Sequence, residues 1–110
     1  MSATVVWNPQ APALVLAKVE LLLAKIAHDI EAWAKLHAPV DTGFLRGSIR
    51  AMPDGAGGGW TVRVGAEYGA YVELGTVNMA AQPYLLPAVE TVRGMLGAGS
   101  PVTILGPASP

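Results

Sequence analysis

The sequence contains no cysteine and little charge, and each absence excludes a class of protein. Because none of the 110 residues is a cysteine, disulfide bonds and thiolate metal sites are excluded. Charged residues make up only 14% of the chain, and the formal net charge is −1. A protein that binds nucleic acid through bulk electrostatics is normally clearly basic, so this class is disfavoured.

The chain also lacks an apolar run long enough to cross a membrane. A spanning helix needs about 20 consecutive apolar residues, and residues 14–30 are interrupted by Lys18, Glu20, Lys25 and Asp29. The first residues carry no basic stretch, so we expect no secretory signal. We therefore expect no membrane partner.

Apolar residues are abundant, at 52% of the chain. With so little charge, a monomer of this size would expose apolar area, and large apolar patches usually mark contact sites. We therefore expect a subunit that associates with copies of itself or is buried in a larger assembly. The alternative is an ordinary domain that is rich in alanine and glycine.

The spacing of apolar residues predicts an α+β fold with a long N-terminal helix. After an extended lead-in over residues 1–10, apolar side chains recur every three or four residues from about Pro12 to His37. The proline at position 39 ends this pattern, because a residue that precedes proline avoids the α region. From Leu45 the period changes to two.

A β-hairpin and a second helix are expected in the rest of the chain. Residues 45–52 and 60–64 alternate around the glycine-rich residues 55–59, which predicts a hairpin with a flexible tip. Residues 65–75 fit a short helix better than a strand, and Pro83 begins a helix that ends near Gly97. We expect one connector domain over residues 1–96 and a C-terminal arm over residues 97–110. The tip and the arm are expected to become ordered only on assembly, the arm as a strand added to a partner's sheet.

One triplet suggests an enzyme. Asp41-Thr42-Gly43 occurs in aspartic proteases, whose reaction needs two carboxylates that share a proton. In those enzymes the triplet follows an apolar strand, whereas here it follows a long helix and precedes Phe44. We expect Asp41 or Thr42 to cap a turn and Gly43 to take a positive φ, and a hydrolase that uses Asp41 is a minor alternative.

No other pattern predicts catalysis, a metal or a cofactor. The glycines at 55–59 lack the lysine that follows in a phosphate-binding loop. His28 and His37 have no third ligand at metal spacing. Arg46, Arg50 and Arg63 could share the polar face of the hairpin. A solvated face, or ion pairs to Glu73 or Glu90, is favoured there over contact with DNA.

Three segments, read in order, carry a resemblance. They are APVDTGFLRGSI at residues 38–49, VGAEYGAYVELGT at 64–76 and AQPYLLPAVE at 81–90. Together they resemble the tail-completion, or head–tail connector, family of long-tailed bacteriophages, over roughly residues 10–96. The family pattern differs at two positions, with alanine common where this chain has Gly69 and phenylalanine common where it has Tyr84.

The resemblance implies a structural virion protein and no enzymatic activity. Its subunits would form a homo-oligomeric ring, a hexamer, at the head–tail junction, after assembly in the host cytoplasm. The implied partners are a head-closure protein and a tail terminator or tail tube, and DNA would pass through the ring without sequence-specific contact. The competing hypothesis is a small regulatory or toxin-like module that binds protein or nucleic acid.

The residues of the three segments are expected to have structural or interface roles. The glycines permit turns, the prolines belong to the start of the last helix, and the tyrosines suit an interface or a core. The glutamate is expected to act as an ion-pair partner or a cap. The candidate residues are Asp41, Thr42, Gly43, Leu45, Arg46, Tyr68, Tyr71, Glu73, Gly75, Pro83, Tyr84 and Pro87.

Overall fold

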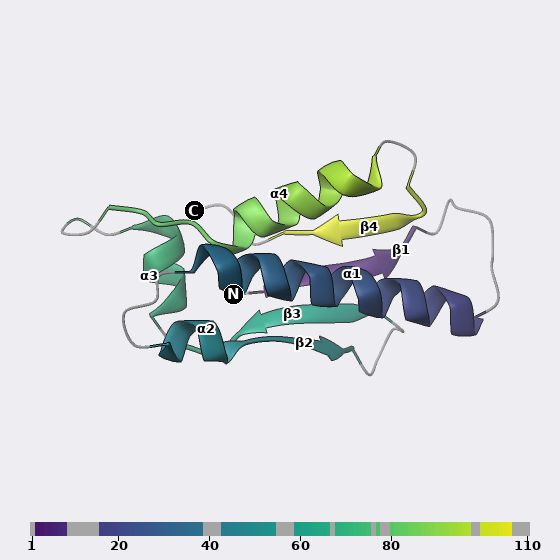
Figure 1. Ribbon diagram of the computed structural model, residues 1–110, viewed down its shortest axis with the longest axis horizontal. Coiled ribbons are helices and arrows are strands. Elements are labelled where there is room, and N and C mark those ends of the chain that lie inside the picture. Colours follow the sequence, from purple (N-terminus) through teal and green to yellow (C-terminus); the bar gives the residue numbers. More distant parts are fainter. Residues whose placement is uncertain are drawn as a thin grey trace.

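A computed structural model describes residues 2–8, 16–38, 43–54, 59–66, 68–75, 77, 80–97 and 100–106. Within these residues the chain is α+β, which confirms the predicted fold class (Figure 1). The elements, in chain order, are β1 (Ser2–Trp7), α1 (Leu16–His37), α2 (Phe44–Ser48), β2 (Ile49–Pro53), β3 (Trp60–Val64), α3 (Gly69–Leu74), α4 (Leu85–Leu96) and β4 (Val102–Leu105).

The four strands form one antiparallel sheet in the order β2-β3-β1-β4. The predicted extended lead-in is therefore β1, an inner strand. The expectation that the arm joins a partner's sheet is wrong for residues 102–105, because they form the edge strand β4 of this chain's own sheet. Val5 lies opposite Ile104 in this pairing, and nothing local in either short strand indicates a partner a hundred residues away.

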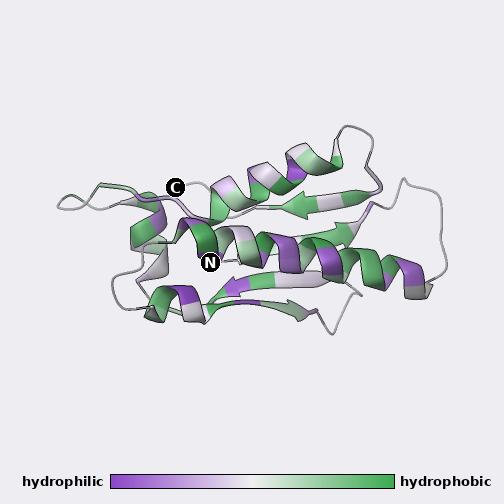
Figure 2. Cartoon of the chain, viewed as in Figure 1, coloured by the Kyte–Doolittle hydropathy of each residue, from purple (hydrophilic) through white to green (hydrophobic). Residues whose placement is uncertain are grey.

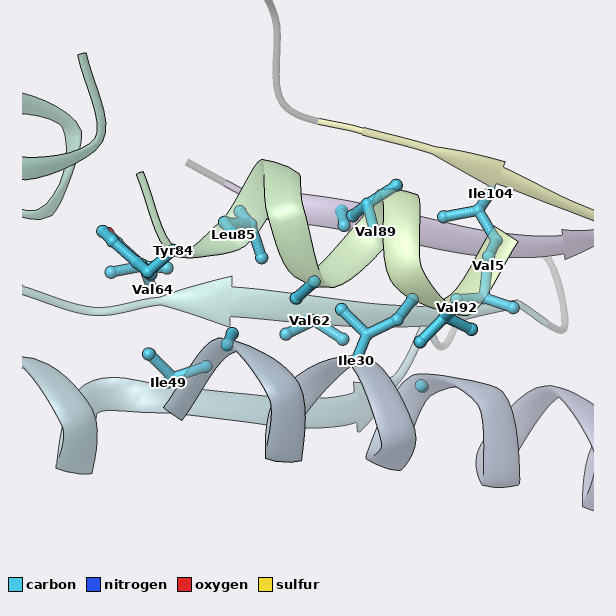
Figure 3. Close-up of a cluster of buried hydrophobic side chains, with 14 of the residues drawn as sticks. Val5, Ile30, Ile49, Val62, Val64, Tyr84, Leu85, Val89, Val92 and Ile104 are labelled. Atoms are coloured by element: carbon cyan, nitrogen blue, oxygen red, sulfur yellow. The ribbon is translucent and has the colours of Figure 1, made fainter. Parts of the chain in front are cut away.

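Both long helices cover one face of the sheet, and the core lies between the two layers (Figure 3). Val5 and Val62 point from the sheet toward Ile30 of α1 and Val89 of α4, and all four are fully buried. The opposite face of the sheet carries the alternate residues of each strand, and no described helix lies over it (Figure 1). This one-sided cover is common for antiparallel sheets.

The predicted long helix and the short helix at Gly69–Leu74 are both present. The last helix begins at Leu85 and not at Pro83, because Tyr84 has a non-helical conformation and serves as its N-cap. It ends where Gly97 takes a φ of 75°. None of the helices in the described part of the chain combines the length and apolar character that spanning a bilayer requires.

The predicted first strand of the hairpin begins too early. Residues 44–48 form α2, and the strand starts only at Ile49. The hydroxyl of Ser48 donates to the carbonyl of Leu45 at 2.7 Å, and Gly43 leads into the helix with a φ of 73°. These local contacts favour a helical turn over the alternating pattern. The predicted tip at residues 55–58 lies outside the described residues.

Candidate interaction surface

Glu73 is a charged side chain inside the protein, where it caps a neighbouring helix. It is 4% exposed. Its Oε1 accepts the backbone N–H groups of Tyr84 at 3.2 Å and Leu85 at 2.7 Å, and its Oε2 accepts that of Leu86 at 3.3 Å. The first N–H groups of a helix have no intrahelical acceptor, and negative charge there is stabilised by the helix dipole. Glu73 therefore joins α3 to the start of α4.

Tyr84 and Gly69 form a second link between the same helices. The Tyr84 ring is fully buried, and its hydroxyl donates to the carbonyl of Gly69 at 2.9 Å. A Cβ atom at position 69 would lie 2.8 Å from the Tyr84 hydroxyl and 2.6 Å from Cγ1 of Val64. The two departures from the family pattern are thus in contact, because glycine at 69 leaves room for the hydroxyl that tyrosine adds at 84.

Burial raises the pKa of the Tyr84 hydroxyl well above its usual value, and the negative charge of Glu73 and the nearby Tyr68 raise it further.

Two backbone hydrogen bonds complete this region. The N–H of Gln82 donates to the carbonyl of Val72 at 2.8 Å, and that of Gly75 donates to Tyr71 at 2.7 Å. The first bond holds the chain just before α4 against α3, and the second closes the last turn of α3.

The outer side of this locked region is apolar and exposed. We call Phe44, Tyr68, Tyr71 and Leu74 the aromatic surface; their exposed fractions are 63%, 40%, 60% and 45%. The last three occur at intervals of three, from Tyr68 at the N-cap of α3 to Leu74 at its end. The rings of Phe44 and Tyr68 stack with centroids 6.1 Å apart. Figure 2 shows hydrophobic residues on α2 and α3 at one end of the molecule. Exposed aromatic side chains gathered in this way are typical of protein interfaces.

The other candidate residues occupy mainly structural positions. Leu45 is buried, Pro83 is exposed just before α4, and Pro87 lies in the first turn of α4, where a missing N–H costs little. Gly75 ends α3 with a φ of 80°. Asp41 and Thr42 lie outside the described residues.

The three hairpin arginines do not share a face as predicted. Arg46 belongs to α2, and its Nε is enclosed without a hydrogen-bond partner among the described residues. Arg50 and Arg63 are directly opposite each other on β2 and β3. No ion pair in the described part of the chain joins them to Glu73 or Glu90. Sequence periodicity missed the separation of Arg46, because it extended the strand through residues 45–48.

The described residues contain no group of three or more histidine, aspartate or glutamate side chains that could hold a metal ion. One pocket, with a volume of about 310 Å³, lies between α4 and β4. Its lining includes Arg93, Ser100 and Ile104 and no carboxylate or imidazole, so it lacks an acid–base pair.

A comparison with protein families identifies one that fits this arrangement. The matching family is described as "Bacteriophage HK97-gp10, putative tail-component", and the match covers residues 11–75. The chain belongs to this HK97-gp10-like family. No curated protein and no solved structure matches the chain significantly.

Membership of the HK97-gp10-like family makes the protein a structural component of a bacteriophage tail, which contacts other tail proteins in the virion. The matched residues contain the whole aromatic surface and Glu73. Helix α4 lies beyond them, although its first N–H groups donate hydrogen bonds to Glu73. The family region therefore includes the carboxylate that fixes α3, and the helix that it caps is contributed by the part of the chain that follows.

Proposed function

We propose that this tail component is a ring-forming subunit at the head–tail junction, a tail-completion protein with no enzymatic activity. The proposed ring contains six copies, as the resemblance of the three segments implies. The proposed neighbours are a head-closure protein on one side and a tail terminator or tail tube on the other, and assembly takes place in the host cytoplasm.

The observation that carries the proposal is the aromatic surface. Tyr71 and Leu74 expose about half of their area although the core between the helices and the sheet is complete without them. Burying an aromatic side chain of this kind contributes strongly to association. The side chains are presented on a helix whose opposite side is fixed by Glu73, so little ordering is required when a partner binds.

The position of this surface also supports a ring. The molecule is elongated, with dimensions of 48 × 24 × 21 Å, and the aromatic surface lies at one end of it (Figure 2). A contact patch at one end that meets a different patch on the next copy is heterologous, and heterologous contacts close into rings when the rotation between copies allows it.

The test replaces Tyr71 by serine in the phage. We expect unjoined heads and tails to accumulate, because the ring loses a central aromatic contact. The matched control is Met95→Ser on α4, since Met95 has a similar exposed fraction, 62% against 60% for Tyr71. Circular dichroism of both purified variants checks that they fold. Normal virions from the Tyr71 variant, or absence of the protein from purified virions, would contradict the proposal.

A further inference from the structure

We propose that the uncovered face of the sheet contacts the phosphate backbone of duplex DNA through Arg50 and Arg63. The surface, here called the arginine face, consists of these two arginines with Thr61 on β3 and Ser2 and Thr4 on β1, and it is bordered on the same side of the sheet by Val6, Met52 and Leu105. The inference deepens the proposed function and rests on it, because it assigns the sheet to the side of the ring along which DNA passes.

The strand register brings the two arginines together. Arg50 is paired directly with Arg63. The backbone bonds from Gly65 to Ser48 and from Asp54 to Gly59 show that this is a hydrogen-bonded position of the antiparallel ladder. The Cα atoms of such a pair are about 5.5 Å apart, and like charges directly opposite destabilise a sheet.

The described residues offer no counter-ion for this pair of guanidinium groups. The recorded ion pairs are formed by Lys25, His28 and Lys35 with acidic residues of the same helix, α1. Asp54 would lie on the same face of the sheet as Arg50, but it is four residues further along, beyond the end of β2. An external anion on the arginine face would therefore relieve a repulsion that no ion pair among the described residues compensates.

The neighbouring side chains fit phosphate better than an acidic protein. Ser2 lies opposite Arg63, and Thr4 lies opposite Thr61, so hydroxyl groups border the guanidinium groups. Arginine, serine and threonine are typical donors to phosphate oxygens. A protein partner would need an apolar centre to bury. The row formed by Arg50, Arg63 and Ser2 contains no apolar side chain, and the apolar residues of this face, Val6, Met52 and Leu105, lie in the rows beyond it. The exposed aromatic residues of this chain lie on α2 and α3.

This placement explains how a protein with a net charge of −1 could meet DNA. Two arginines from one subunit bind weakly, but a ring repeats the arginine face in every copy around the same duplex. The contact is made to the backbone, so it carries no sequence preference and lets the DNA move through.

The test follows amide chemical shifts of the full-length protein by NMR while a short DNA duplex is added at low salt. We expect changes on β1, β2 and β3 around Arg50, Arg63 and Thr4. Neutralising two phosphates gives a slope of about −2 in a plot of log affinity against log salt. Arg50→Ala/Arg63→Ala should abolish both the changes and the slope.

The matched control is Lys18→Ala/Lys25→Ala, which removes the same charge from exposed positions on α1. Equal weakening by the two double variants would overturn the inference, because it would reduce the contact to bulk charge. Shifts of the arginine face with poly-glutamate but not with DNA would overturn it in favour of an acidic protein. Either failure leaves the ring untouched, since the Tyr71 variant tests assembly separately.

Discussion

The carboxylate of Glu73 bridges two helices that the sequence separates by a loop. Backbone N–H groups at the start of α4 donate to it, and the amino-terminal residue of that helix, Leu85, forms the shortest of these bonds at 2.7 Å. The side chain is buried, so the three donors have no water to replace it. Glu73 contributes to the free energy of unfolding mainly by accepting hydrogen bonds from these backbone donors, and less through its own charge.

Replacing Glu73 tests this role. Glu73→Ala leaves three backbone donors without an acceptor, and we expect a loss of about 2–4 kcal/mol in the free energy of unfolding. Glu73→Gln keeps one carbonyl oxygen and should lose about half as much. Urea denaturation followed by circular dichroism measures both. Equal stability of the alanine variant and the unmodified protein would show that α4 does not depend on this cap.

The contact between Gly69 and Tyr84 predicts that the two positions are coupled. Gly69→Ala alone forces a Cβ against the Tyr84 hydroxyl and Val64, and we expect a loss of about 1–3 kcal/mol. Tyr84→Phe alone removes the bond to the Gly69 carbonyl and should cost about 1 kcal/mol.

The double variant, Gly69→Ala/Tyr84→Phe, has the residues that are common in the family at both positions. Its loss should be smaller than the sum of the two single losses, because phenylalanine removes the atom that the new Cβ would meet. A double-mutant cycle measured by urea denaturation gives this coupling. Strict additivity would show that the clash with Val64 alone decides the cost.

The raised pKa of Tyr84 predicts a loss of stability in alkali. The folded protein holds the hydroxyl neutral, whereas the unfolded chain ionises it near pH 10, its usual pKa. The contribution of the neutral Tyr84 hydroxyl to the free energy of unfolding is therefore complete below about pH 10. Above this pH the free energy of unfolding falls by about 1.4 kcal/mol per pH unit, because the unfolded chain releases a proton that the folded protein keeps. Tyr84→Phe should remove this part of the slope, and Tyr71→Phe, at an exposed position, should keep it.

At the scale of elements, the outer edge of β2 is closed to further strands. The ladder turns the N–H groups of Ile49 and Ala51 outward. The first donates to the carbonyl of Arg46, and the second donates to Oε2 of Glu31 on α1. Pro53, the next outward residue, has no N–H. An edge that offers carbonyl acceptors but no free N–H donors pairs poorly with a further strand, which protects an exposed sheet from aggregation.

Opening this edge should therefore promote aggregation. Glu31→Ala frees the N–H of Ala51, and we expect faster, concentration-dependent light scattering of the variant at unchanged secondary structure. Glu20→Ala removes the same charge from an exposed position of the same helix and serves as the control. If the two variants scatter alike, the carboxylate acts through net charge and not through the strand edge.

Local patterns predicted the helices better than the sheet. The apolar spacing of residues 16–37 is long enough to identify α1, and the proline and glycine signals identify the hairpin. The same alternation extended the strand wrongly through residues 45–48, because it cannot register the Ser48 hydroxyl that closes a helical turn. The pairing of β1 with β4 and the contact of Glu31 with Ala51 join residues that are far apart in the sequence, so local sequence patterns could not predict them.

The same limit applied to the candidate residues. The motif marked Tyr68, Tyr71 and Tyr84 alike, but burial separates the first two from the third. Glu73 was expected to be an ion-pair partner or a cap, and its neighbours became visible only when α3 and α4 were placed together. Phe44 was not selected, although its exposed ring stacks on Tyr68. The signal available in the sequence was its position next to Gly43, where the chain turns into α2.

At the scale of the whole molecule, two surfaces divide the contacts. The aromatic surface at one end is uncharged and suits a protein neighbour, whereas the arginine face on the bare side of the sheet suits an anion. The side chains of both surfaces are exposed or partly exposed and lie outside the shared core, so a substitution in one is expected to leave the other folded. This separation is what allows assembly and DNA contact to be tested with different variants.

Removal of β4 should affect the whole molecule. A chain that ends at Gly97 loses Val102 and Ile104 from the core and leaves β1 as an exposed edge. We expect it to unfold or aggregate, as measured by circular dichroism and gel filtration. A stable, monomeric truncated chain would restore the interpretation of these residues as an arm outside the folded domain.

The pairing of β1 with β4 has a consequence for biosynthesis. Thr4 lies opposite Leu105, so the sheet closes only after about a hundred residues have left the ribosome. Until then β1 lacks one of its two neighbouring strands, and its exposed edge and apolar side chains favour aggregation. Pairing of β1 with β4 is therefore expected to be a late and slow step of folding, because it must close a loop of about a hundred residues.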